Sequence, residues 1–173
     1  AQAYWQQQQL PVTVVRCFNT CGPRQSSAYG MVIPNMIQRA LRREPILVFG
    51  DGRQSRCFSA VSDVVSGVMM LADHKGTEGE IYNIGTDEEI TVLDLAQRIK
   101  TLCHSDSAIQ FVAYEDIYGS SFEDMRRRVP NLAKIRRAVG YEPRVTLDQL
   151  LEVTIRDMCE QMRLPVPAGL ATA

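Results

Sequence analysis

The chain has 173 residues, of which 45% are hydrophobic and 23% charged, and its 19 basic residues nearly balance its 20 acidic ones. This composition predicts one folded domain with a sizeable core and excludes intrinsic disorder and a fibrous repeat. No apolar run approaches the roughly 18–20 residues that a membrane-spanning helix needs. With a net charge of −1 the chain has no excess of basic residues for binding nucleic acid or an acidic membrane surface, so neither is expected as a partner.

The cysteines form an odd, scattered set without a CxxC pair and without metal-ligand spacing near a histidine. They are Cys17, Cys21, Cys57, Cys103 and Cys159. Since no signal peptide is visible either, we expect reduced thiols, a cytoplasmic location and no metal site. The chain starts at Ala1 without an initiator Met or a helix cap, so we expect residues 1–10 to be the last turns of a helix and the chain to be part of a longer protein.

Strands and helices alternate along the chain, which predicts an α/β fold. The run at residues 12–18 is β-branched and almost continuously apolar, as is typical of a parallel strand covered on both faces. Such a strand needs neighbours, which must come from outside this sequence or from a second copy of the chain. Shorter strands are predicted at residues 46–49, 57–61, 81–84 and 109–113.

Helices are predicted wherever apolar residues recur with the helical period. These segments are residues 32–41, 62–71, 92–102 and 147–158. Ser62 is placed to cap the second of them, and Thr91 with Asp94 to cap the third. A further short helix is bounded by Asn131 and by Gly140, which suits the left-handed position after a helix.

Three segments contain more polar and turn-forming residues than a packed core requires. The turn after the first strand lies at a carboxyl end, where open α/β sheets bind ligands. In the segment 47–56, Phe49 can stack on a flat base and Arg56 can hold a phosphate with its planar fork. The arginines at residues 126–128 suit a diphosphate. Structural roles stay open for all three: a turn capped by Asn19, a hairpin with a core Phe49 and a solvated Arg56, and a solvated charged face.

Several catalytic motifs are missing from the sequence. It has no glycine-rich phosphate loop, no HExxH, no GxSxG and no paired acid motif. We expect His74 and His104 to be surface residues, and Asp63 to help its helix start rather than act as a base.

Taken together, the polar segments and several shorter motifs follow one order along the chain. They are Arg16-x-Phe18-Asn19-Thr20-x-Gly22-Pro23-Arg24, Pro34-Asn35, Leu47-x-Phe49-Gly50-Asp51-Gly52-x-Gln54-x-Arg56-x-Phe58, Asp63-Val64, Tyr82-Asn83-Ile84-Gly85 and Gly140-Tyr141-Glu142-Pro143. This set resembles the carboxyl-terminal half of an extended short-chain dehydrogenase/reductase of the NAD-dependent nucleotide-sugar epimerase/dehydratase group, closest to the UDP-glucose 4-epimerases. The resemblance runs from about residue 4 to about residue 160.

The resemblance implies an α/β fold that is the carboxyl-terminal part of an extended Rossmann-type dehydrogenase, mainly its small mixed α/β substrate-binding lobe. Residues 1–24 would then be the terminal helix and strand of the NAD-binding Rossmann domain, and residues 25–164 the nucleotide-sugar-binding lobe. As an alternative, residues 57–75 return to the Rossmann domain. Residues 165–173 are expected to be a flexible tail.

The resemblance also implies roles for individual residues. Asn19 would contact the sugar diphosphate, and Leu47 and Phe49 would flank the uracil or thymine ring. Arg56 would bind the diphosphate.

The resemblance implies two further sites, one for the cofactor and one for the diphosphate and ribose. The loop of Cys21, Gly22 and Pro23 would lie near the nicotinamide. The family's Arg-x-Gly-Asp stretch is replaced by residues 121–125, so that Arg126 or Arg127 would supply the second arginine for the diphosphate. Asp124 would hold the ribose. Residues 121–125 read Ser-Phe-Glu-Asp-Met.

The full-length members of the family use NAD. This chain has no glycine loop. It also has no Tyr-x-x-x-Lys pair, because the residue four positions after Tyr4 is Gln8. No catalytic residue is therefore assigned, and no bound NAD is expected.

The leading hypothesis is that the chain is the substrate-binding part of a UDP-sugar 4-epimerase and is inactive alone. The alternatives are part of a UDP-glucuronate decarboxylase or a dTDP/UDP-sugar 4,6-dehydratase, a stand-alone nucleotide-sugar-binding module, and a structural product. The partners expected are a UDP-sugar or other nucleotide-sugar and a second copy of the chain, with strand exchange through residues 12–18 as one route to a homodimer.

Overall fold

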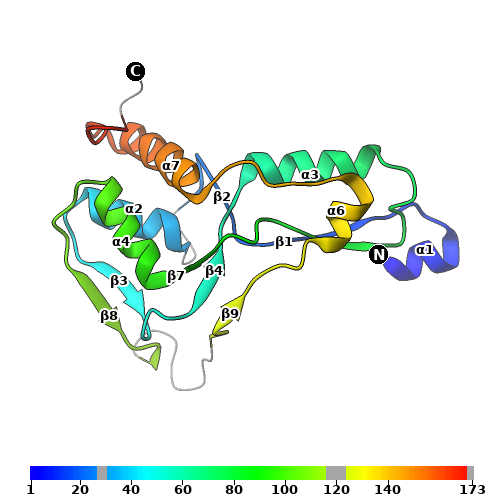
Figure 1. Ribbon diagram of the computed structural model, residues 1–173, viewed down its shortest axis with the longest axis horizontal. Helices are drawn as coiled ribbons and strands as arrows, with labels where there is room; N and C mark the ends of the chain where they lie inside the picture. The colour runs from blue at the N-terminus through cyan, green and yellow to red at the C-terminus, as the bar shows by residue number, and fades with distance from the viewer. Residues whose placement is uncertain (27–30, 116–123, 171–173) are drawn as a thin grey trace. The chain divides into compact units, whose positions relative to one another are not determined.

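The computed structural model describes residues 1–26, 31–115 and 124–170 and divides the chain into two compact units (Figure 1). Unit 1 consists of Ala1–Cys21, Cys57–Glu89 and Val129–Leu147. Unit 2 consists of Gly22–Arg56, Ile90–Arg128 and Asp148–Ala173. Each unit is assembled from three separate stretches of sequence, so neither is a continuous segment with a single boundary. The segment 57–75 lies in unit 1 together with the first 21 residues.

Unit 1 contains short parallel strand pairs and three helices. Its elements are α1 (Gln2–Gln8), β1 (Val14–Cys17), β2 (Thr20–Cys21), β5 (Ser59–Ala60), α3 (Val61–Asp73), β6 (Ile81–Ile84) and α6 (Ala133–Val139). β1 pairs in parallel with β6, with Val14 opposite Ile81, and β2 pairs in parallel with β5. The expected strand at residues 12–18 therefore does find a neighbour within the chain.

The core of unit 1 lies where α3 and the segment around α6 meet β6. Its buried side chains are Val64, Leu71, Tyr82, Ile84, Leu132, Ile135 and Tyr141. Gly67 permits this close packing, because a Cβ atom there would lie 2.3 Å from Ile84 Cδ1 and 2.8 Å from the Tyr141 ring. Tyr141 donates its hydroxyl proton to the Gly85 carbonyl at 2.8 Å, which satisfies the one polar group that it buries.

Unit 2 contains the remaining helices and strands. They are α2 (Val32–Leu41), β3 (Ile46–Phe49), β4 (Ser55–Cys57), β7 (Glu89–Thr91), α4 (Val92–Leu102), β8 (Ile109–Val112), β9 (Arg127–Arg128) and α7 (Leu147–Met162). β4, β7 and α7 each have one terminal residue that belongs to unit 1. β3 pairs in parallel with β8, and α2 and α4 pack on each other and on β3 (Figure 1). A second sheet has the order β7-β4-β9.

Most predicted elements are confirmed, and the differences are local. The Thr91 hydroxyl accepts the Asp94 backbone N–H at 3.0 Å and caps α4, and Gly140 ends α6 with a φ of 67°. The strand predicted at residues 57–61 is wrong in its extent, because the segment divides into the end of β4 and the short β5, and α3 already begins at Val61. Ser62 therefore lies inside the helix and does not cap it.

Asp63 acts over a longer range than its expected role at the start of its own helix. Its carboxylate is buried and accepts the backbone N–H groups of Arg144 and Val145 at 3.0 and 2.9 Å. The side chain thus ties α3 to the segment that precedes α7, within unit 1.

The flexibility expected of the tail at residues 165–173 stays a prediction, and the structure describes contacts for part of it. Leu170 is only 5% exposed, and the His104 ring Nε2 lies 2.8 Å from the Ala168 carbonyl oxygen.

All five cysteines are free thiols. Of the helices in the described part of the chain, none has the length and apolar character to cross a membrane.

Candidate nucleotide-binding site

A cavity of about 370 Å³ lies within unit 2. Four of the predicted binding residues line it: Leu47, Phe49, Arg56 and Asp124. Its other lining residues come mainly from α2, namely Val32, Asn35, Met36 and Arg39, and are joined by Gln54, Val92 and Tyr114. The structure thus brings together side chains from residues 32 to 124 that the sequence places far apart.

The alternation of β3 creates the apolar end of this cavity. Ile46 and Val48 are completely buried, whereas Leu47 and Phe49 are half-buried and turn to the cavity, because successive side chains of a strand point to opposite faces. The Phe49 ring lies 6.2 Å from the Tyr114 ring at an angle of 39°. These side chains offer flat apolar surface to a planar group such as a base.

Arg56 forms the cationic end of the cavity. Its side chain is only 13% exposed, and its Nη2 atom lies 2.5 Å from Asp124 Oδ1. Its Nη1 atom donates to the Ser55 carbonyl at 2.7 Å. The hypothesis of a hairpin with a solvated Arg56 is therefore wrong: β3 pairs with β8, and the guanidinium is part-buried and paired with a carboxylate.

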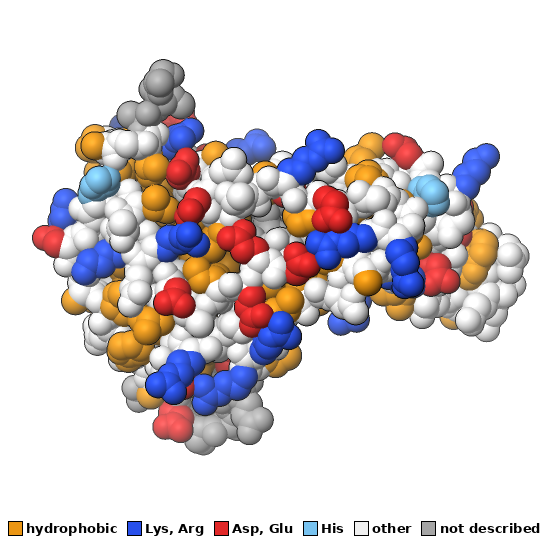
Figure 2. Space-filling view, in the orientation of Figure 1, with side chains coloured by type: hydrophobic (Ala, Val, Ile, Leu, Met, Phe, Trp, Pro, Cys, Tyr) orange, Lys and Arg blue, Asp and Glu red, His pale blue; other side chains and the backbone are white. Residues whose placement is uncertain are grey.

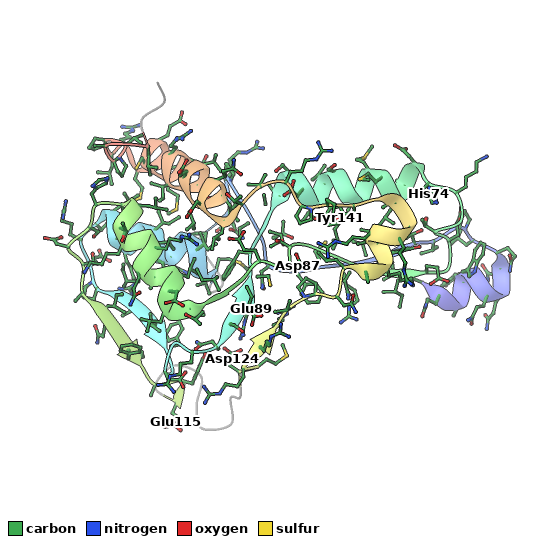
Figure 3. The ribbon with its side chains drawn as sticks, in the orientation of Figure 1. His74, Asp87, Glu89, Glu115, Asp124 and Tyr141 are labelled. Atoms are coloured by element: carbon green, nitrogen blue, oxygen red, sulfur yellow. The ribbon has the colours of Figure 1, made fainter. Side chains whose placement is uncertain are left out.

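A chain of hydrogen bonds joins the apolar end to the cationic end. Gln54 Nε2 donates to the Phe49 carbonyl at 2.8 Å and to the Tyr114 hydroxyl oxygen at 2.9 Å. The Tyr114 hydroxyl donates in turn to Asp124 Oδ2 at 2.7 Å, so that both Asp124 oxygens accept a hydrogen bond. Burial, together with the neighbouring Asp124 carboxylate, raises the pKa of Tyr114, which keeps its proton on the oxygen. Figure 3 shows Asp124 between the end of β8 and the start of β9.

The turn after β3 makes room for Tyr114. Gly50 has a φ of 66°, and a Cβ atom there would lie 2.6 Å from Tyr114 Cε2. A glycine meets both requirements, since it tolerates a positive φ and leaves space for the ring.

The three neighbouring arginines differ in their surroundings. The Arg126 side chain is 77% exposed and pairs with Asp51 at 2.7 Å, which holds the pKa of Asp51 below its usual value. Arg127 and Arg128 form β9, where Arg128 is the partner of Arg56 in register. Figure 2 shows basic side chains gathered around β9 beside acidic ones. Arg126 does not line the cavity but a second hollow beside it, which shares Gln54, Tyr114 and Asp124.

Tyr114 was not among the residues predicted for this site, whereas Gln54 lies in the predicted segment 47–56 and Arg128 in the predicted arginine cluster 126–128. Tyr114 directly follows the strand predicted at residues 109–113, and a parallel pairing of that strand with residues 46–49 would have placed both carboxyl ends together. Gln54 carried no such signal, because only the fold shows that its amide is buried. Arg128 is distinguished from its neighbours by strand register alone.

Comparison with known proteins gives the chain a family. The model of the NAD-dependent epimerase/dehydratase family matches residues 1–85. A UDP-N-acetyl-alpha-D-glucosaminuronate decarboxylase of Bacillus cytotoxicus is 42% identical over 150 residues, which are 86% of this chain and 46% of that protein. UDP-glucuronic acid decarboxylase 1 of Danio rerio is 38% identical over 89% of this chain and 35% of its own length.

The chain belongs to the NAD-dependent epimerase/dehydratase family. A UDP-glucose 4-epimerase of Thermotoga maritima, solved with UDP-glucose, superposes with a TM-score of 0.82 at 30% identity, over 93% of this chain and 50% of that structure. The mixed α/β fold therefore matches about half of an epimerase structure. The chain likewise spans less than half the length of the curated relatives described above.

Asn19, the family residue predicted to contact the sugar diphosphate, lies in unit 1 between β1 and β2. Its side-chain Nδ2 donates to the Cys57 carbonyl at 2.7 Å, and its own carbonyl accepts the Ser59 N–H at 3.1 Å. Its amide therefore has a structural partner, as in the interpretation of a capped turn. A contact with substrate stays a prediction.

The loop predicted to lie near the nicotinamide of the family's NAD crosses the boundary between the units. Cys21 ends unit 1, and Gly22 and Pro23 begin unit 2. The Cys21 thiol is buried and donates to the Asn19 carbonyl at 3.3 Å, so its side chain is not available to a cofactor. A position of Cys21, Gly22 and Pro23 near the nicotinamide stays a prediction.

Proposed function

We propose that unit 2 binds the nucleotide of a UDP-sugar, and that the protein acts in the NAD-dependent conversion of that sugar. The observation that carries this proposal is the cavity with Leu47 and Phe49 at one end and the part-buried Arg56 at the other. A uracil ring would lie against the apolar end, and the diphosphate would meet the guanidinium, which binds phosphate oxygens in pairs.

Arg128 supports a site for two phosphates. Because partners in parallel strands lie side by side, the register of β4 and β9 sets Arg128 next to Arg56. We propose Arg128 as the second arginine for the diphosphate, in preference to the predicted Arg126 or Arg127. Arg126 already pairs with Asp51, and Arg127 is in register with Ser55.

Decarboxylation of UDP-glucuronate is the favoured reaction. The curated relatives described above act on hexuronate nucleotides, at 42% and 38% identity, and this supports the decarboxylase alternative over the 4-epimerase of the leading hypothesis. The 4-epimerase stays the second candidate because of the likeness to the UDP-glucose 4-epimerase structure. In the enzyme that contains this sequence, release of CO2 from UDP-glucuronate would support the first, and interconversion of UDP-glucose and UDP-galactose the second.

Calorimetry on the 173-residue chain tests nucleotide binding directly. We expect UDP to bind in the micromolar range and ADP to bind more weakly, since the larger purine has to fit the same apolar end. Phe49→Ala should weaken UDP and uridine alike, whereas Arg56→Gln should weaken UDP and leave uridine unchanged. Arg43→Gln is the matched control, because Arg43 is exposed and pairs with Asp106 outside the cavity. Equal losses in both arginine variants would contradict the assignment of Arg56.

A further inference from the structure

Arg56 is not open to a ligand in this structure, because an acidic side chain of the protein holds it. Asp124 Oδ1 lies 2.5 Å from Arg56 Nη2, and both side chains line the cavity. Among the described residues that line the cavity, Asp124 is the one carboxylate. It lies where a phosphate oxygen would have to approach the guanidinium.

The hydrogen bonds around Asp124 fix it in this place. Its second oxygen accepts the Tyr114 hydroxyl at 2.7 Å, and Tyr114 is itself held by Gln54 at 2.9 Å. The raised pKa of Tyr114 keeps this hydroxyl a donor. Asp124 thus has a cation at one oxygen and a hydroxyl donor at the other, which are the partners that a bound phosphate group would have.

A diphosphate cannot join this pair without a change. Two anions that share a partly buried cation repel each other, because the low local dielectric strengthens like-charge repulsion as much as attraction. Asp124 is part-buried, so leaving its carboxylate beside a second anion without its cation would also be unfavourable. The ligand therefore has to displace the carboxylate from Arg56, and part of the ligand's interaction with Arg56 is lost in doing so.

We propose that Asp124 is an internal competitor that occupies Arg56 in the ligand-free protein and is displaced when a diphosphate binds. This inference rests on the proposed function of the cavity as a nucleotide site. It replaces the predicted contact of Asp124 with the ribose. Asp124 thereby lowers the affinity for every ligand that uses Arg56, and it leaves the affinity for an uncharged nucleoside unchanged.

Calorimetry with uridine, UDP and inorganic pyrophosphate tests this competition in four proteins: wild type, Asp124→Asn, Tyr114→Phe and Asp106→Asn. Asp124→Asn keeps a hydrogen-bond acceptor beside Arg56 but removes the competing charge, so UDP and pyrophosphate should bind about tenfold more tightly, with uridine unchanged. Tyr114→Phe removes only the anchor of Asp124 and should give a smaller gain. Asp106→Asn makes the same change in charge at an exposed ion pair outside the cavity and should match wild type.

The outcomes separate this proposal from the proposed function. Unchanged or weaker UDP binding by Asp124→Asn overturns the competition, and a parallel loss for uridine would instead indicate a ribose contact. If Asp124→Asn does not fold, Tyr114→Phe decides, because a variant that keeps the carboxylate but gains no UDP affinity is also incompatible with competition. Failure of uridine and UDP to bind any of the four proteins contradicts the proposed function as well, and so does binding of uridine without UDP, whereas equal UDP affinity in wild type and Asp124→Asn contradicts only the competition.

Discussion

Gln54 offers the sharpest test of how the cavity is built, because its one buried amide bonds both the Phe49 backbone and the Tyr114 hydroxyl. The side chain is 6% exposed and donates to the Phe49 carbonyl at 2.8 Å and to the Tyr114 hydroxyl oxygen at 2.9 Å. Gln54→Leu keeps most of the volume and removes both hydrogen bonds. The Phe49 carbonyl and the Tyr114 hydroxyl oxygen then each lose one hydrogen-bond donor.

The cost follows from these two bonds. At about 1 kcal/mol each, their loss should lower the free energy of unfolding by about 2 kcal/mol. For a chain of this size, that corresponds to a fall of about 4–8 °C in the midpoint of thermal unfolding. UDP affinity should fall together with stability, since the Phe49 backbone and the Tyr114 hydroxyl each lose a bond that positions them.

Urea unfolding followed by circular dichroism measures this loss, with Gln161→Leu as the matched control. Gln161 makes one exposed hydrogen bond, to Asp157, so the same substitution there should change stability by no more than about 0.5 kcal/mol. If the two leucine variants unfold at the same urea concentration, Gln54 does not support the cavity, and the argument from its hydrogen bonds is wrong.

Three further predictions concern packing and titration. Gly67→Ala should lower the unfolding free energy by about 2 kcal/mol in urea titrations, although alanine favours helices, because its Cβ would lie 2.8 Å from the Tyr141 ring; an unchanged midpoint would refute this. Tyr141→Phe should cost about 1 kcal/mol through its lost bond to the Gly85 carbonyl. Burial raises the pKa of Tyr141 from 10.0 to about 12, so the unfolded chain loses this proton first and stability should fall as the pH rises through that range. The phenylalanine variant should show a shallower fall, and identical pH profiles would contradict the assignment. Ellman's reagent at pH 8 should modify the exposed Cys17 first, because burial raises the pKa of Cys103 to about 12; rapid reaction of several thiols would show that the core opens.

Local sequence patterns were sufficient for much of this fold. The apolar period placed α2 at residues 32–41, and the capping pair of Thr91 and Asp94 fixed the start of α4. The apolar run at residues 46–49 predicted β3, although its four apolar residues did not show which of them face the cavity. These features depend on neighbours within a few residues, which a sequence displays directly.

The division into units and the polar network could not be predicted in this way. Each unit combines three distant stretches, and the strands of two or three residues are held by pairing rather than by an apolar pattern. The contact of Asp124 with Arg56 joins residues 68 positions apart. The resemblance to a family suggested both residues for one ligand, but only the coordinates show that they bind each other.

The most direct test of the account is a titration of the 15N-labelled chain with UDP, followed by amide chemical shifts. We expect saturable shifts at Leu47, Phe49 and Arg56 in β3 and β4, with matching changes at Tyr114 and Asp124 as the carboxylate leaves Arg56. A nucleotide that produces no saturable shift, or one whose shifts spare the segment from Leu47 to Arg56, would contradict the conclusion that this cavity is a nucleotide site.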